Sequence, residues 1–300
     1  MLAWHARFSR FLPGSELSRL NADPRRTVPV RPLMARFAQA VQSAGALTGG
    51  LVDATLVHEL VSAGYGGELG EPLALARALA LAPPRAPAGA SPATRWRELE
   101  VDLAAGTVGR PPGVKLDSGG LAKGLFADVL GATLASHASF AVNCAGDLLL
   151  GGSAESPRAV KVQSPFDAST IHTFELERGG VATSGIGRRS WLDGAGMPAH
   201  HLLDPATGRP AFTGVVQVTA LAPSALGAEI KAKAALLSGP RGARAWLAHG
   251  GVIVFDDGAH EVVQPPPRVT LGQLAAYVRP PAPGRGRRAT RDRAGACAAP

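Results

Sequence analysis

KLDSGGLAKG, residues 115–124, joins an apolar run to a predicted helix and combines a carboxylate, two glycines and a lysine. Gly119 and Gly120 allow the backbone to approach a ligand closely, and the free N–H groups in the first turn of the following helix attract anions. Lys123 lies in that turn and adds a positive charge suited to a phosphate. The spacing matches neither the Walker loop nor the GxGxxG fingerprint, so the stretch alone fits a phosphate site and an ordinary glycine corner equally well.

Outside this stretch the hydrophobic pattern predicts helices and strands in irregular alternation. Helices are predicted at 31–45, from Asp53 to Gly64, and at 121–135, 224–237 and 241–248. Strands are predicted near 97–103, 106–117, 140–143, 159–163, 173–177, 181–183, 215–221 and 252–256, with a Pro/Ala/Gly loop at 83–93. Many strands and few helices in this order indicate an α+β fold with a mostly antiparallel sheet and flanking helices, rather than a doubly wound fold.

The composition indicates a folded protein with a large core. Of the 300 residues 46% are hydrophobic, and no stretch approaches the roughly 20 consecutive apolar residues of a membrane span. The first residues, MLAWHARFSR, do not form a secretory signal. The only cysteines in the sequence, Cys144 and Cys297, rule out a disulfide framework and favour the cytoplasm. We therefore expect a cytoplasmic protein with no stable membrane insertion.

The net charge of +8 is concentrated at the end of the chain. Arg279–Pro300 holds six arginines and one aspartate, which is +5 of the +8 and leaves +3 for the rest. No predicted helix carries a basic stripe with interleaved aromatic residues, so the sequence predicts no nucleic-acid partner. The basic tail at 279–300 is rich in Pro, Gly and Arg and is predicted to be disordered; contact with an acidic surface is the alternative to a solvated tail.

Two further stretches place polar side chains at the ends of predicted strands. Asn143–Asp147 follows a short apolar strand and fits either a ligand contact or a turn that satisfies its own hydrogen bonds. Thr183, Ser184 and Gly185 end another strand. Their hydroxyls suit a phosphate or a flavin carbonyl, although hydroxyls at strand ends are common.

Two more stretches contain titratable residues. His200 and His201 precede the rigid Asp204-Pro205 turn, and a histidine at this place suits a proton-transfer role as well as a structural one. Glu229 and Lys233 lie four residues apart on a predicted helix. They form either a surface ion pair worth roughly 0.2–0.5 kcal/mol or a site in which Glu229 is an oxygen ligand for Mg²⁺.

In their order along the chain, these stretches resemble the ApbE family of FAD:protein FMN transferases. The resemblance runs over about residues 7–240 and is carried by Phe8–Phe11, Ser15–Asn21, Val52–Thr55, Asp117–Gly124, Asn143–Asp147, Thr183–Gly185, His201–Pro205 with Thr207–Gly208, and Ala228–Glu229. It implies an ApbE-type α+β fold in a domain at 1–278, a bound FAD and a Mg²⁺-dependent reaction. Such enzymes cut the FAD pyrophosphate, pass FMN to a threonine hydroxyl of a target protein as a phosphoester, and release AMP. The implied partner is an acceptor protein with a threonine flavinylation motif.

The resemblance also implies residue roles. His201 is expected to be the base that takes the threonine proton, and Lys123 is expected to face the phosphate charge as the second catalytic residue. Gly120 and Glu229 are expected to hold the metal. The residues expected to bind FAD are Ser15, Asn21, Asp117, Gly119, Gly120, Asn143, Asp147, Thr183, Ser184 and Gly185.

The sequence departs from the family pattern at two places. The family's metal helix usually has an aspartate followed four residues later by a threonine, and both bind the metal; Glu229 and Lys233 stand there in this chain. Glutamate can still bind Mg²⁺ and a charged lysine cannot, so we expect altered metal dependence. Family members also carry a Met-Gly-Thr motif before Phe8, so either the start of this sequence is misassigned or its N-terminal part is shortened. An export signal hidden by such a truncation is the alternative to the cytoplasmic location. The alternative function is a FAD-binding protein with at most FAD pyrophosphatase activity.

Overall fold

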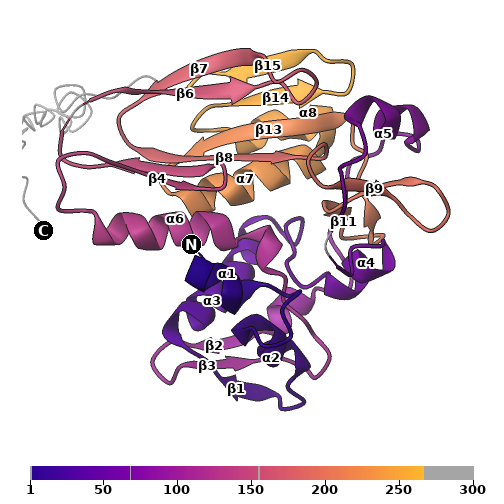
Figure 1. Cartoon of the computed structure of the whole chain (residues 1–300), viewed down its shortest axis with the longest axis vertical. Coiled ribbons are helices and arrows are strands. Elements are labelled where there is room, and N and C mark those ends of the chain that lie inside the picture. Colours follow the sequence, from indigo (N-terminus) through magenta and orange to yellow (C-terminus); the bar gives the residue numbers. More distant parts are fainter. Residues whose placement is uncertain (1, 68, 155, 267–300) are drawn as a thin grey trace, which may run out of the picture. The chain divides into compact units, whose positions relative to one another are not determined.

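A six-stranded antiparallel sheet is the largest element of the fold (Figure 1). The computed structural model describes residues 2–67, 69–154 and 156–266, so the basic tail predicted at 279–300 lies outside the described residues. In spatial order the strands are β15 (His260–Val263), β14 (Gly251–Phe255), β13 (Val215–Ala222), β8 (Gly179–Gly185), β5 (Asp147–Gly151) and β4 (Phe140–Cys144). Each pair is antiparallel, which confirms the mostly antiparallel α+β fold expected from the sequence.

Two helices, α6 (Ala122–Thr133) and α7 (Ala225–Leu237), run along one face of this sheet (Figure 1). Small residues bring α7 close to the strands, because Ala228 packs against Ala182 of β8 and Ala222 of β13. The two helices also approach each other closely. A Cβ added at Gly124 of α6 would lie 2.7 Å from the carbonyl oxygen of Ala225. Glycine at this position is therefore required by packing.

On the other side of α6 lies a smaller layer made largely from the first part of the chain (Figure 1). Its helices and strands are α1 (Leu2–Phe8), α2 (Glu16–Ala22), α3 (Pro32–Leu47), β1 (Thr27–Pro29), β2 (Glu100–Asp102) and β3 (Thr107–Gly109). The three strands form an antiparallel sheet in the order β1-β3-β2. Phe8 packs edge-on against Phe37 of α3 and Phe126 of α6, so one aromatic cluster joins three helices.

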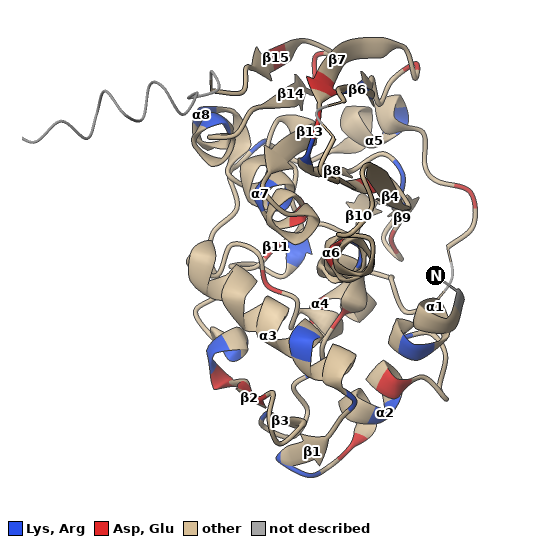
Figure 2. Ribbon diagram, turned by 90° about the vertical axis from the view of Figure 1, so that its left-hand side faces the viewer, with Lys and Arg blue, Asp and Glu red and all other residues tan. Residues whose placement is uncertain are grey.

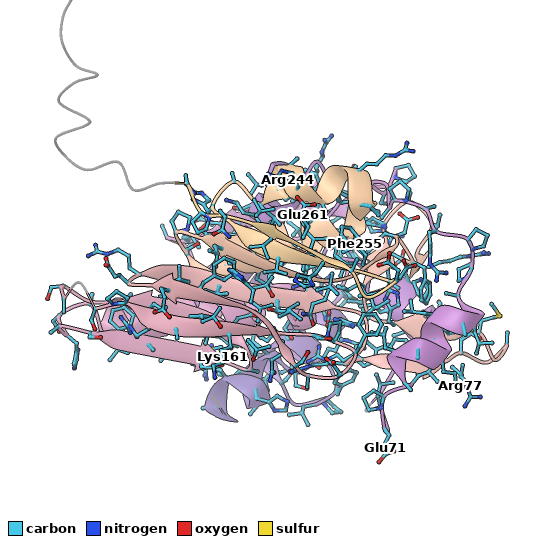
Figure 3. All side chains as sticks on the ribbon, turned by 90° about the horizontal axis from the view of Figure 1, so that it is seen from above. Glu71, Arg77, Lys161, Arg244, Phe255 and Glu261 are labelled. Atoms are coloured by element: carbon cyan, nitrogen blue, oxygen red, sulfur yellow. The ribbon has the colours of Figure 1, made fainter. Side chains whose placement is uncertain are left out.

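Shorter elements complete the described part of the chain. They are α4 (Val57–Ser62), α5 (Leu75–Leu81), a 3₁₀ helix (Arg95–Glu98), the hairpin β6 (Arg158–Gln163) and β7 (Thr170–Leu176), β9 (Ser190–Leu192), β10 (Pro198–His200), β11 (Leu203–Asp204), β12 (Arg209–Pro210), α8 (Gly239–Ala243) and a 3₁₀ turn (Arg244–Trp246). Arg244 of that turn forms an ion pair with Glu261 of β15, beside the edge of the large sheet (Figure 3).

Several predicted elements differ from the structure in their bounds, and three of them illustrate why. The strand predicted at 106–117 ends at Gly109, because Pro111 and Pro112 follow and have no N–H for a ladder. The helix predicted from Asp53 begins only at Val57. The helix predicted at 241–248 is split into α8 and the 3₁₀ turn. Within the described residues we find no helix that is both long and apolar enough to span a membrane.

Candidate active site

The glycine turn of the opening motif lines a cleft with the segment after β10 and with α7. The polar side chains of the cleft are Asp53, Asp117, His201 and Lys233, and apolar residues supply most of the remaining wall. Its volume is about 60 Å³. Pockets for whole organic ligands are usually about 300–1,000 Å³. The cleft therefore has the size of a subsite for one small group of a larger ligand.

The backbone of the motif is held by residues from the start of the chain. The side-chain amide of Asn21 pairs with both backbone groups of Leu116, with N···O distances of 2.9 and 2.8 Å. The hydroxyl of Ser118 donates to the carbonyl of Phe8 at 2.6 Å, and the N–H of Asp117 donates to the carbonyl of Ala54 at 2.9 Å. A 3₁₀ turn over Ser118–Gly120 then leads into α6. Asn21 thus positions this stretch through its backbone.

Arg10 forms an ion pair with the carboxylate of Asp117. Its Nε lies 3.0 Å from Oδ1, and its Nη2 donates to the carbonyl of Tyr65 at 2.6 Å. The guanidinium also lies over the rings of Phe11 and Tyr65, 4.2 and 4.6 Å from the centroids. A Cβ at Gly119 would lie 2.9 Å from Oδ2 of Asp117, so a side chain there would push against this carboxylate.

Four charged side chains on α6, β5 and α7 form two ion pairs, and one of the four, Lys233, lines the cleft. Lys123 Nζ lies 2.9 Å from Oδ2 of Asp147, and Lys233 Nζ lies 2.9 Å from Oε1 of Glu229. The second oxygen of Glu229, Oε2, accepts the backbone N–H of Gly124 at 2.9 Å. Figure 2, coloured by charge, shows acidic and basic positions together on α7. With two ammonium groups and two carboxylates, the four side chains have no net charge when all are ionised.

Burial alters the titration of this group. Asp147 begins β5 and its side chain is 1% exposed. Burial and the nearby charge of Glu229 raise the pKa of Asp147 to about 6, against the opposing effect of Lys123 and Lys233. At neutral pH the carboxylate is therefore mostly ionised, with a fraction still protonated.

His201 lines the cleft, whereas its neighbour His200 belongs to the core. Nδ1 of His201 is buried and has no hydrogen-bond partner among the described residues. Burial, then the charges of Arg189, His200 and Lys233, hold the pKa of His201 well below 6.5. His200 is 1% exposed, packs edge-on against Phe212, and its pKa is lowered to about 3 by burial. Of the two histidines, His201 is the one available as a neutral base.

Other residues expected to bind FAD have local partners. Ser15 caps α2 by accepting the N–H of Ser18 at 2.9 Å. Asn143 is exposed and accepts the N–H of Gly146 at 2.8 Å within the turn between β4 and β5. Asn143 therefore belongs to a turn that satisfies its own hydrogen bonds, which is one of the two alternatives predicted from the sequence.

The side chains at the end of β8 point alternately to the two faces of the sheet. Thr183 is paired by a hydroxyl–hydroxyl hydrogen bond of 2.8 Å with Thr219 of β13. Side chains alternate along a strand, and Ala182 faces α7, so Thr183 points away from α7 while Ser184 points toward it. The structure therefore does not bring Thr183 to the α7 face, and Gly185 follows at the end of the strand.

No role was predicted for Asp53 and Arg10, which both contribute to the site. Asp53 lines the cleft, accepts the N–H and hydroxyl of Thr55 at 2.8 and 2.6 Å, and has a pKa raised mainly by burial. An aspartate two residues before a threonine is a local signal for such a turn. No local signal identifies Arg10, because its partner is 107 positions away.

The residues present do not fit the expected magnesium ion. Both carboxylate oxygens of Glu229 already accept hydrogen bonds from the protein, and the ammonium of Lys233 stands beside them. A charged lysine has no lone pair for a metal. Among residues 2–67, 69–154 and 156–266, no group of three or more His, Cys, Asp or Glu side chains is arranged to hold a metal ion.

Curated relatives of the chain share one name. The FAD:protein FMN transferase of Rhodobacter capsulatus is 31% identical over 156 residues, which is 49% of this chain and 29% of that protein. The FAD:protein FMN transferase of Treponema pallidum is 32% identical over 168 residues, which is 49% of this chain and 46% of that protein. The chain thus aligns with less than half the length of these two relatives.

Solved structures are similar over most of both chains. The ApbE protein of Thermotoga maritima has a TM-score of 0.67 and 26% identity, covering 86% of this chain and 84% of that one. The flavinyl transferase ApbE of Pseudomonas stutzeri, at 22% identity, shares the fold with a TM-score of 0.64, over 87% and 82% of the two chains. A model of the ApbE family matches residues 1–255. The chain therefore belongs to the ApbE family, as its sequence motifs led us to expect.

Proposed function

We propose that the chain is an FAD:protein FMN transferase, which moves FMN from FAD to a threonine hydroxyl of an acceptor protein and releases AMP. Membership of the ApbE family supports the reaction class. The structural observation that carries the proposal is the composition of one cleft. His201, whose Nδ1 has no hydrogen-bond partner in the part of the chain that the structure describes, lines the same small cleft as the Gly119-Gly120 turn and Lys233.

In the proposed reaction the threonine Oγ attacks the phosphorus of the FMN half of FAD. The new P–O bond forms as the bond to the bridging pyrophosphate oxygen breaks, and AMP leaves with that electron pair. The threonine proton passes to His201, which is neutral at pH 7 because its pKa is low. Lys233 in the cleft, and Lys123 on the first turn of α6, oppose the negative charge on the phosphates.

The proposed site differs in part from the one expected from the sequence. His201, Lys123, Asp117, Gly119 and Gly120 keep their proposed roles near the phosphates. Ser184, Gly185 and Asp147 remain proposed flavin contacts, while Ser15 and Asn21 are proposed to act by holding the backbone of the site. Magnesium dependence is not part of the proposal, because the ammonium of Lys233 lies 2.9 Å from Glu229 and neutralises its charge.

Transfer of FMN in vitro tests the proposal. The full chain is incubated with FAD and an acceptor domain that carries a threonine flavinylation motif, with and without magnesium. Mass spectrometry measures the FMN adduct, and chromatography measures AMP and free FMN. An adduct matched by an equal amount of AMP is expected. AMP with free FMN and no adduct would instead support the alternative, a FAD-binding pyrophosphatase. A His201→Ala variant, expected to bind FAD without transfer, is the control for a base-assisted reaction.

A further inference from the structure

Lys233 and Glu229 form a buried ion pair on α7 at the edge of the cleft. The residues are 7% and 1% exposed, and the two charged atoms lie 2.9 Å apart. Exposed lysines on helices rarely keep one fixed partner, whereas an ammonium removed from water must keep a counter-charge. The position of the Lys233 ammonium is therefore fixed by Glu229.

The ammonium retains donors for a ligand. A lysine ammonium has three N–H groups, and within the described part of the chain the one hydrogen bond found for Lys233 goes to Glu229. Lys233 also lines the cleft with Gly119 and Gly120, the glycines of the predicted anion site. A phosphate oxygen in the cleft would meet a fixed positive charge with free donors.

A divalent cation at Glu229 would lie beside this ammonium and be repelled by it. Each oxygen of Glu229 already accepts one hydrogen bond, Oε1 from Lys233 and Oε2 from the N–H of Gly124, so a metal would have to share an oxygen with one of these donors while its charge opposes that of Lys233. The four charges Lys123, Asp147, Glu229 and Lys233 already sum to zero, so the cluster offers no excess negative charge to attract a cation. Replacing Lys233 by a neutral residue would leave a net charge of −1 and a free carboxylate oxygen.

We infer that the ammonium of Lys233 takes the place of a divalent cation in this chain, neutralising Glu229 and binding the pyrophosphate of the flavin dinucleotide directly. FAD binding then needs no metal ion. The identity of the ligand rests on the proposed function. The position of the cation, and its exclusion of a metal, rest on the contacts of Lys233 itself.

Metal-free binding of FAD by the full chain is the test. Flavin fluorescence gives the Kd for FAD in EDTA and in excess Mg²⁺, and the two values are expected to agree within about twofold. Electron paramagnetic resonance of added Mn²⁺, without any nucleotide, is expected to show only free ion. An affinity that rises by about tenfold or more with Mg²⁺, or stoichiometric Mn²⁺ binding, would overturn the inference.

A substitution at Lys233 tests the opposite case, in which the ammonium is absent. In Lys233→Thr the Kd for FAD in EDTA is expected to rise by about tenfold or more, and Mg²⁺ is expected to restore part of it, with Mn²⁺ now bound. Lys231→Thr, which removes a partly exposed lysine of the same helix outside the cleft lining, is the matched control and should change neither reading. If Lys233→Thr does not fold, the wild-type measurements still decide.

The inference and the proposed function fail separately. Metal-independent FAD binding without transfer would contradict the proposed transferase function and still support the role of Lys233. Transfer that depends on bound Mg²⁺ would support the proposed transferase function and contradict the inference about Lys233.

Discussion

Lys233 Nζ lies 2.9 Å from Oε1 of Glu229, one helical turn earlier on α7, and both side chains are buried. From the sequence, the pair was one of two alternatives, a surface ion pair or a metal ligand beside a lysine. The structure shows an ion pair inside the protein. Energetically this differs from a surface pair, because removal of either partner leaves the other charge largely buried and unpaired.

The Glu229–Lys233 pair should therefore show strong coupling. Glu229→Ala should lower the free energy of unfolding by about 3–5 kcal/mol, and Glu229→Ala/Lys233→Ala by less than the sum of the two single changes. Urea denaturation in a double-mutant cycle measures this coupling. The exposed pair Arg26–Glu100, at 2.7 Å, is the matched control and should couple by less than about 1 kcal/mol. Additive single effects at 229 and 233 would contradict the expectation.

Arg10 should be needed for both stability and ligand binding. Lysine cannot reproduce the two directed bonds to Asp117 and Tyr65 together with the ring contacts, so Arg10→Lys should destabilise the fold by about 1–3 kcal/mol and weaken FAD binding. Denaturation and flavin fluorescence measure the two effects. Arg26→Lys, at an exposed ion pair, should leave both unchanged. Unaltered FAD affinity in Arg10→Lys would show that the Asp117 contact does not shape the site.

The role of His201 predicts a separation of binding from turnover. His201→Ala should keep the Kd for FAD and lower the rate of FMN transfer by roughly 10²–10⁴-fold. Because the pKa of His201 is lowered, the imidazole stays neutral as the pH falls, and the wild-type rate should persist below pH 6.5. Single-turnover rates across pH give the profile. Weaker FAD binding in the variant would make His201 a binding residue.

Asp147 should make stability fall as the pH rises from about 4 to 6. Its pKa is raised from 3.8 to about 6 in the folded protein, so the folded state binds the proton more tightly than the unfolded state between these values. The free-energy cost of ionising Asp147 in the folded protein is absent below the unfolded pKa of 3.8 and complete above the folded pKa of about 6. At its largest this cost is about 3 kcal/mol. Urea denaturation of both proteins across this range should show Asp147→Asn becoming more stable relative to wild type as the pH rises. A difference that is constant with pH would contradict the assignment.

The close approach of α6 to α7 predicts an effect of one methyl group. Gly124→Ala should cost about 1–3 kcal/mol, because the new Cβ meets the backbone of Ala225 and Leu226, which cannot turn aside. Thermal or urea denaturation measures the loss. Gly194→Ala, where nothing lies within 4 Å and no unusual φ is required, is the control and should stay within about 0.5 kcal/mol.

Long elements with strong periodicity were predictable from the sequence. Helices at 31–45 and 224–237 match α3 and α7, and strands at 215–221 and 252–256 match β13 and β14 to within one or two residues. Other elements were missed. β5 is an example: the turn before it, Asn143–Asp147, was one of the predicted alternatives, but Leu148–Leu150 is a run of three leucines without the polar alternation that indicates a half-buried strand.

The sequence motifs supply most of the residues that line the cleft, but the orientation of their side chains could not be predicted. The strand GGVATSG has small residues on both faces, so its hydrophobic pattern does not tell which of Thr183 and Ser184 faces α7. Likewise the spacing of Glu229 and Lys233 predicted their contact, but burial depends on α6 and β5, which come from elsewhere in the chain. Tertiary packing decided these points.

The cleft draws its lining from residues between Leu51 and Leu237, in segments separated by long stretches of chain. While the protein is being synthesised, the lining of the cleft stays incomplete until α7, which carries Lys233 and Leu237, has emerged from the ribosome. On the proposed function, flavin would bind only to a chain in which α7 has joined the rest of the cleft. A nascent chain stopped before Lys233 should therefore bind no flavin.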